Sequence, residues 1–226
     1  MPLSEEFCDS PYQFMKKHIV VVTISDQFIK PNRNVVTAFV VEDDRADIAE
    51  PPDPQSKVCK LYLAEDPGAP KPPPQHTRRV YWCHYEAGAT HDSMLGKGHA
   101  YMFTPTMNGC TLGVGSQNNG VVRVAHSNVA QSSAGMPNAK ATIQLQAHRQ
   151  VATLDARFEQ ANDPLKKIAP PFAYMKGSRG IDISRNATTF GRRNDRDEWQ
   201  FYSLIYRKID STYYHFGIKD FTHGIV

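Results

Sequence analysis

Residues 104–126 read TPTMNGCTLGVGSQNNGVVRVAH, two short apolar segments separated by a polar turn sequence. The middle piece, Gln117-Asn118-Asn119-Gly120, predicts a tight turn because Asn and Gly tolerate the positive φ angles that hairpin turns need. The segments on either side alternate between two kinds of residue, which is the period of a β-strand. We therefore predict a β-hairpin, with Cys110 in its first strand and His126 in its second.

The alternation also predicts which side chains of this hairpin share a face. Even-numbered positions carry the large apolar residues together with Cys110 and His126. Burying both apolar faces together requires a register that pairs even with even positions. A three-residue loop, Asn118-Asn119-Gly120, provides that register, whereas a two-residue turn separates the faces unless a bulge corrects it. We expect the three-residue loop, which sets Cys110 opposite Asn128 and His126 opposite Leu112, so that thiol and imidazole are diagonal neighbours.

A cysteine beside a histidine predicts nucleophilic catalysis. A free thiol has a pKa of about 8.5, and an adjacent imidazole can take its proton and lower that pKa. Gly109 lets a substrate carbonyl approach the backbone closely, and N–H groups of this turn, including that of Cys110, are candidates for an oxyanion hole. Thr104 ends the preceding strand and is the candidate acceptor for the second imidazole N–H, which would hold the tautomer of His126.

Two interpretations compete with this one on the residues alone. An unpaired cysteine is most often a small buried hydrophobe, so Cys110 in the core of a non-catalytic binding module is an alternative, with the proline-rich loops near residues 50–54 and 67–75 carrying recognition. A cysteine peptidase is the other, with Asn128 orienting the imidazole. Cys8, Cys59 and Cys83 show no CxxC spacing and are expected to be free thiols.

Thr104, Asn108-Gly109-Cys110 and His126 resemble the core of the bacterial glutamine deamidases. This family includes the catalytic domain of the cytotoxic necrotizing factors, the Burkholderia lethal factor and the chemotaxis receptor deamidase. In it a small residue and a glycine precede the nucleophilic cysteine, and the histidine follows on the neighbouring strand. The sequence departs from the family pattern at Asn108, where Ser is common, and at Met107, where Leu is usual. The resemblance covers the hairpin region alone.

The resemblance implies a fold and an activity. The fold would be α+β, an antiparallel β-sandwich with flanking helices like that of the cytotoxic necrotizing factors, with Cys110 at the base of a cleft. The activity would be conversion of a glutamine in a partner protein to glutamate, with catalytic Cys110, His126 and Thr104, and with Asn108 and Gly109 in the oxyanion loop. No cofactor and no metal are needed, and a transglutaminase remains an alternative. The protein would be a toxin or effector delivered into a target cell by a secretion system.

The rest of the chain predicts one domain over residues 1–226, mostly strand. The expected strands are His18–Ile24, Val35–Glu42, Val58–Leu63, Arg79–Tyr85, Ala100–Thr104, Trp199–Ile209 and Tyr213–Ile218. One clear helix is expected over residues 138–160, because apolar residues recur there at steps of three and four. The polar, Arg-rich segment 176–196 is interpreted as a surface loop. His91-Asp92 and His99 are interpreted as surface residues on a Gly-rich loop, with a place in the lining of the cleft as the alternative for one of them.

Composition and motifs argue against several classes of function. The 26 basic residues exceed the 23 acidic ones by only 3, too small a bias to predict nucleic-acid binding. The longest apolar run, residues 19–24, is too short to cross a bilayer, and no signal peptide is visible, so we expect no membrane partner and a cytoplasmic location in the producing cell. No HxxxH, HExxH or CxxC spacing predicts a zinc site.

Overall fold

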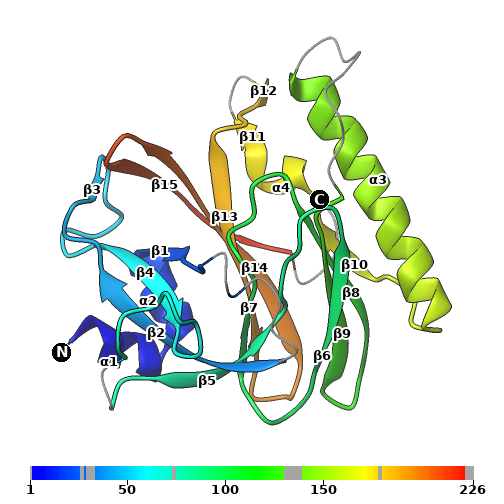
Figure 1. Ribbon diagram of the computed structural model, residues 1–226, viewed down its shortest axis with the longest axis horizontal. Helices are drawn as coiled ribbons and strands as arrows, with labels where there is room; N and C mark the ends of the chain where they lie inside the picture. The colour runs from blue at the N-terminus through cyan, green and yellow to red at the C-terminus, as the bar shows by residue number, and fades with distance from the viewer. Residues whose placement is uncertain are drawn as a thin grey trace.

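The computed structural model describes residues 2–25, 28, 34–72, 75–129, 139–177 and 180–221. Their strands form two main sheets (Figure 1). The larger sheet has the order β1 (Ile19–Val22), β4 (Val58–Leu63), β2 (Val35–Glu42), β5 (Arg78–Trp82), β7 (Tyr101–Phe103), β13 (Arg185–Arg193), β14 (Trp199–Ile209), β15 (Thr212–Asp220) and β3 (Asp47–Ile48). The smaller sheet has the order β10 (Lys167–Ala169), β8 (Thr111–Asn118), β9 (Val121–Ser127) and β6 (Thr90–Leu95).

Most strand pairs are antiparallel, and the described exceptions are β1 with β4, β5 with β7 and β15 with β3. A separate short ladder joins β11 (Lys176–Gly177) to β12 (Gly180–Ile181). The described helices are α1 (Leu3–Asp9), α2 (Pro11–Lys17), α3 (Ala139–Gln160) and α4 (Pro171–Met175). The chain is therefore α+β and mostly strand, with two packed sheets and few helices, as predicted.

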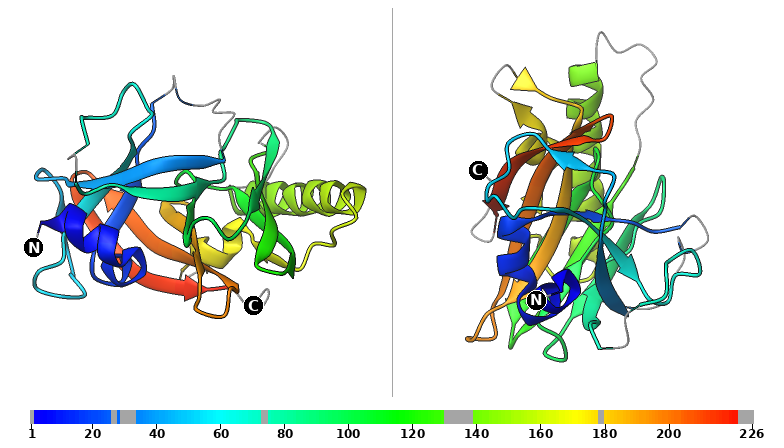
Figure 2. Two further views of the ribbon diagram at one scale, coloured as in Figure 1. Left: turned by 90° about the horizontal axis from the view of Figure 1, so that it is seen from below. Right: turned by 90° about the vertical axis from the view of Figure 1, so that its left-hand side faces the viewer.

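Three clusters of buried apolar side chains define the layers. The first packs α1 and α2 against one face of the larger sheet, where Phe7 contacts both Phe14 and Phe103. The second lies between the two sheets. The third packs α3 through Leu154 and Phe158 on the outer face of the smaller sheet. Figure 2 shows the consequence, with α1 and α2 at one end of the molecule and α3 at the other.

Several predicted elements are confirmed and several are wrong. β2, β4 and β14 have the predicted bounds, and α3 begins one residue after its prediction. The predicted surface loop 176–196 instead contains β13, which pairs with β7 and β14 inside the larger sheet. The prediction was wrong because the Arg-rich ends of this segment flank a buried centre, residues 187–191. His91-Asp92, interpreted as surface residues on a loop, lie in β6, and α1, α2 and α4 were not predicted.

The β8–β9 hairpin has the predicted register but not the predicted loop. Asn118 pairs with Val121, so the turn contains two residues, Asn119 with φ 49° and Gly120 with φ 75°. A β-bulge between Val114 and Gln117 then adds one residue to β8 and restores the pairing of even with even positions, as Leu112 opposite His126 shows. The three-residue loop is therefore wrong, and the bulge supplies the register that burial of both apolar faces demands.

Alanine at Gly115, inside this bulge, is expected to lower the free energy of unfolding by about 1–3 kcal/mol. A Cβ there would lie 2.6 Å from Oδ2 of Asp163, and that carboxylate accepts the Ser116 N–H at 2.8 Å, so it cannot move away freely. Urea denaturation measures the loss. Gly98→Ala is the control, because its Cβ would meet Tyr81 Oη at an ordinary 3.4 Å. Equal losses in both variants would contradict the steric account.

Candidate active site

Thr104 and His126 form a buried hydrogen-bonded pair. Thr104 follows β7 in the larger sheet, and His126 lies in β9 of the smaller sheet. Thr104 Oγ1 and His126 Nδ1 are 2.5 Å apart, as the predicted orienting role requires. When Nδ1 carries the proton and donates it to Thr104, the opposite nitrogen, Nε2, presents a lone pair. The two sheets thus hold the imidazole in one orientation.

Nε2 of His126 is buried and has no hydrogen-bond partner among the described residues. The whole residue is 1% exposed. Burial lowers the pKa of His126 to about 3, and the nearby imidazoles of His84 and His91 act in the same direction. At neutral pH the imidazole is therefore uncharged, in the protonation state that a general base needs.

Cys110 immediately precedes β8, and the residue is 3% exposed. Sγ donates to Oδ1 of Asn128 at 3.3 Å, and within the described residues it makes no hydrogen bond to His126. Burial raises the pKa of the Cys110 thiol to about 12, which the backbone N–H of Asn108 only partly offsets. The resting thiol is therefore neutral, unlike the thiolate–imidazolium pair expected from the sequence.

Hydrogen bonds from Tyr174, Gln146 and Gln150, which the sequence did not predict, hold the turn before Cys110. Gly109 has φ +90°, and its N–H donates to Tyr174 Oη at 2.9 Å. The same hydroxyl donates to the Cys110 carbonyl at 2.9 Å. Gln146 and Gln150 of α3 donate to the Gly109 carbonyl at 2.8 and 3.1 Å. A polar residue on the apolar stripe of α3, at Gln150, was the one signal of this contact in the sequence.

Tyr174→Phe is expected to lower the free energy of unfolding by about 1–3 kcal/mol, because it leaves the buried Gly109 N–H and Cys110 carbonyl without their shared partner. The same loss frees the turn that positions Sγ, so we also expect slower alkylation of Cys110. Thermal unfolding and thiol labelling measure the two effects. Tyr62→Phe is the control, since the Tyr62 hydroxyl makes no hydrogen bond within the described part of the chain. A Tyr174→Phe protein as stable as this control would contradict the bridging role.

These contacts reduce the number of backbone N–H groups in the predicted oxyanion loop that are free to donate to a substrate. The Gly109 N–H is occupied by Tyr174, and the Asn108 N–H interacts with the Cys110 sulfur. The Cys110 N–H makes no hydrogen bond to the residues that the structure describes. Of the predicted oxyanion donors, the N–H of Cys110 is therefore the one free to bind a developing oxyanion.

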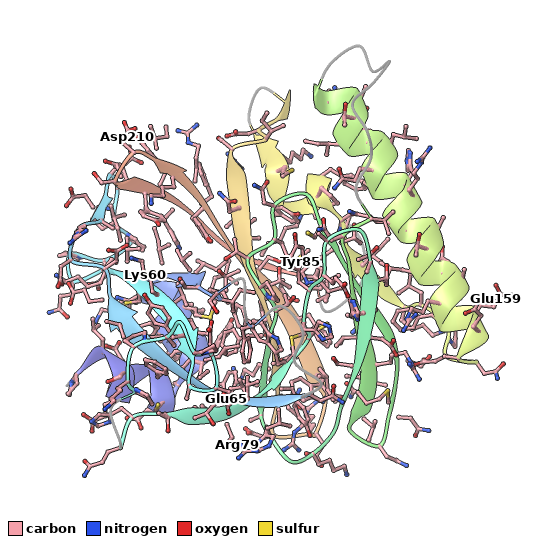
Figure 3. All side chains as sticks on the ribbon, viewed as in Figure 1. Lys60, Glu65, Arg79, Tyr85, Glu159 and Asp210 are labelled. Carbon is pink, nitrogen blue, oxygen red and sulfur yellow. The ribbon has the colours of Figure 1, made fainter. Side chains whose placement is uncertain are left out.

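The thiol opens into a cavity of about 380 Å³. Its lining residues are Val22, Thr23, Ile24, Tyr85, Pro105, Thr106, Asn108, Cys110 and Asn128. Tyr85, labelled near the centre of the molecule in Figure 3, also lies over His126, with ring centroids 5.5 Å apart. A larger cavity of about 510 Å³ lies near Glu159, at the distant end of α3, and contains none of the predicted site residues.

The other sequence candidates lie around this site or away from it. His91 pairs with His126 across β6 and β9, and its ring stacks on His84 with centroids 4.2 Å apart. His91 Nε2 and Glu86 Oε2 are 2.9 Å apart, so this imidazole is held by a carboxylate. Cys8, Cys59 and Cys83 are free thiols. No group of three or more His, Cys, Asp or Glu in the described ranges is arranged to hold a metal ion.

The described helices include none that is long and apolar enough to cross a membrane. In comparisons with known proteins, no family model and no curated protein matches this chain. The assignment of chemistry to Cys110 and His126 therefore depends on their geometry and on the resemblance of the hairpin sequence.

Proposed function

We propose that this protein is a cysteine-dependent amide hydrolase that converts a glutamine of a partner protein to glutamate. The observation that carries the proposal is the imidazole of His126. Its Nδ1 is bonded to Thr104, and its buried Nε2 has no hydrogen-bond partner among the described residues, on the hairpin face that also carries Cys110 beside a cavity. A histidine held in one tautomer, on the same face as a cysteine, is an arrangement that nucleophilic catalysis uses.

The reaction follows from these groups. Nε2 of His126 takes the proton of the Cys110 thiol, and Sγ attacks the carboxamide carbon while the Cys110 N–H binds the oxyanion. The imidazolium returns the proton to the leaving nitrogen, the C–N bond breaks, and ammonia departs from a thioester. Water then gives a proton to Nε2 and attacks the thioester, the C–S bond breaks, and Nε2 returns the proton to Sγ, which yields glutamate and the free thiol. Every group in these steps belongs to the chain, the substrate or water.

The contacts of Asn128 favour this reading over the peptidase alternative. That alternative requires Asn128 to orient the imidazole, but Asn128 bonds the thiol and Thr104 holds the orienting position at Nδ1. The choice of a glutamine side chain as substrate rests on the resemblance of residues 104–126 to the glutamine deamidases. By the same resemblance, the substrate is a protein of a target cell into which this chain is delivered, as a toxin or effector. A transglutaminase would use the same first half-reaction, with an amine in place of water.

The test is ammonia release from a lysate of candidate target cells, with wild-type protein and with Cys110→Ser. We expect ammonia from the wild type alone, together with glutamine-to-glutamate changes that peptide mass spectrometry locates in particular lysate proteins. Incorporation of ¹⁸O from labelled water into the new carboxylate would separate hydrolysis from transfer to an amine. Cleavage of lysate proteins without ammonia would make the protein a peptidase. Identical behaviour of both proteins in every assay would make Cys110 structural.

A further inference from the structure

The side-chain carboxamide of Asn128 lies against the Cys110 thiol. Its Oδ1 accepts the Cys110 thiol at 3.3 Å, and both residues line the 380 Å³ cavity together with Tyr85. Burial raises the pKa of the Tyr85 phenol, and a hydrogen-bonding interaction with the Asn128 side chain partly offsets that rise. A primary carboxamide of the protein itself thus sits between the nucleophile and the cavity wall, and a glutamine side chain ends in the same chemical group.

The backbone and the side chain of Asn128 are held differently. The Asn128 N–H donates to Ala89 O at 2.9 Å, and the Asn128 carbonyl accepts the Gly88 N–H at 3.0 Å, so the backbone is anchored at the start of the strand pair. The side chain is half-buried, its Oδ1 accepts the thiol proton, and its carboxamide also interacts with the Tyr85 hydroxyl. Rotation about the side-chain bonds can therefore remove the carboxamide from Sγ without disturbing the hairpin.

The direction of the thiol–amide hydrogen bond has a chemical consequence. A carbonyl oxygen only accepts hydrogen bonds, so Oδ1 stabilises S–H and disfavours a thiolate at the same place. Meanwhile Nε2 of His126, the base that would take the proton, has no hydrogen-bond partner in the described part of the chain. The resting structure therefore directs the thiol proton to Asn128 and away from the imidazole.

We propose that Asn128 is a positioning residue whose carboxamide occupies the substrate's place and keeps Cys110 a neutral thiol until a substrate carboxamide displaces it. The inference rests on the proposed function for the identity of the displacing group. On displacement the S–H···Oδ1 hydrogen bond breaks, Sγ turns toward His126, and the proton passes from Sγ to Nε2. The electron pair left on Sγ is then the nucleophile, so activation requires no other reactant.

The opposite orientation of the Asn128 amide predicts the opposite effect on the reactivity of Cys110. If Nδ2 faced the sulfur, its N–H would donate to a thiolate and would lower the thiol pKa. Removing the amide would then slow the reaction of Cys110 with electrophiles. Removing an Oδ1 acceptor should instead speed it. The sign of the change in Asn128→Ala therefore decides between the two.

The experiment is alkylation of Cys110 by iodoacetamide across the neutral and alkaline pH range, with peptide mass spectrometry to assign the labelled thiol. Four proteins are compared, namely wild type, Asn128→Ala, His126→Ala and the double variant. We expect Asn128→Ala to react about five- to tenfold faster at neutral pH, the effect of losing one hydrogen bond to the neutral form, with a lower pH midpoint. In the His126→Ala background the same substitution should give a smaller gain, because the thiol proton then passes to solvent and no longer to a neighbouring imidazole.

An unchanged or slower rate in Asn128→Ala would overturn the inference, and so would an equally large gain in the His126→Ala background. The buried thiols of Cys59 and Cys83 report on folding, since both must stay unlabelled in every protein compared. Ammonia release is measured separately. Faster alkylation without ammonia release supports the role of Asn128 and overturns the deamidase proposal. Ammonia release with unchanged alkylation supports the deamidase and overturns the role of Asn128.

Discussion

Cys110→Ser protein is expected to fold like the wild type and to release ammonia about 10³ to 10⁴ times more slowly. The fold should persist because a serine hydroxyl is smaller than the thiol and can donate to Asn128 Oδ1 in its place. Activity should fall because a hydroxyl is a far weaker acid than a thiol, and the neutral imidazole of His126 must remove its proton. Initial rates of ammonia release, with matched thermal unfolding curves, measure the two expectations.

Cys8→Ser is the matched control for this variant. Cys8 is half-buried in α1, in the layer that packs on the far face of the larger sheet, so a serine there should leave the rate of ammonia release unchanged. A similar loss of rate in both variants would point to destabilisation rather than to loss of the nucleophile. Full activity of Cys110→Ser would remove the thiol from the mechanism.

His126→Gln is expected to change how stability depends on pH, as well as to abolish activity. Burial lowers the pKa of His126 to about 3, from an ordinary 6.5. Below pH 6.5 the unfolded chain binds a proton at this residue that the native chain does not bind. The native state therefore keeps this stability above pH 6.5 and loses it as the pH falls toward 3, by about 1.4 kcal/mol per pH unit. Glutamine does not titrate, so the variant should lose this part of the acid sensitivity.

Urea denaturation at a series of pH values below neutrality measures how steeply the free energy of unfolding changes with pH. The comparison uses the difference between wild type and variant, because His18, His84 and His215 also have lowered pKa values through burial and add to the acid sensitivity of both proteins. Cys110→Ser retains His126 and should retain the wild-type slope. Equal slopes in His126→Gln and wild type would show that His126 is protonated in the native state and is not the neutral base proposed here.

The β8–β9 hairpin shows which structural features a local sequence pattern can predict and which it cannot. Alternation of apolar residues predicted its two strands and the register that sets His126 opposite Leu112. It could not predict how that register is achieved, because a three-residue loop and a two-residue turn with a bulge bury the same side chains. The choice depends partly on Gly115, where the bulge brings the strand against Asp163, a residue almost fifty positions away that the alternation does not include.

Local sequence patterns could not predict β13, and they could not predict the hydrogen bonds that hold the turn before Cys110. The reason is related in both cases. The Arg-rich ends of β13 look like a surface loop, and only pairing with β7 and β14 explains why residues 187–191 are buried. Tyr174 meets Gly109 across 65 positions of sequence, and no periodicity relates the two residues. Contacts of this kind come from the packing of layers, which one segment of sequence does not encode.

The sequence by itself determined the chemistry available to this protein: an α+β chain rich in strands, a hairpin with Cys110 and His126 on one face, and Thr104 within reach of the imidazole. The tertiary structure alone decided the state of those groups. Enclosure between two sheets raises the pKa of the thiol and lowers that of the imidazole, because a low-dielectric interior disfavours both charged forms. The sequence placed Asn128 opposite Cys110, but only the folded structure shows that its Oδ1 accepts the thiol proton, and the resting pair is neutral where the sequence predicted an ion pair.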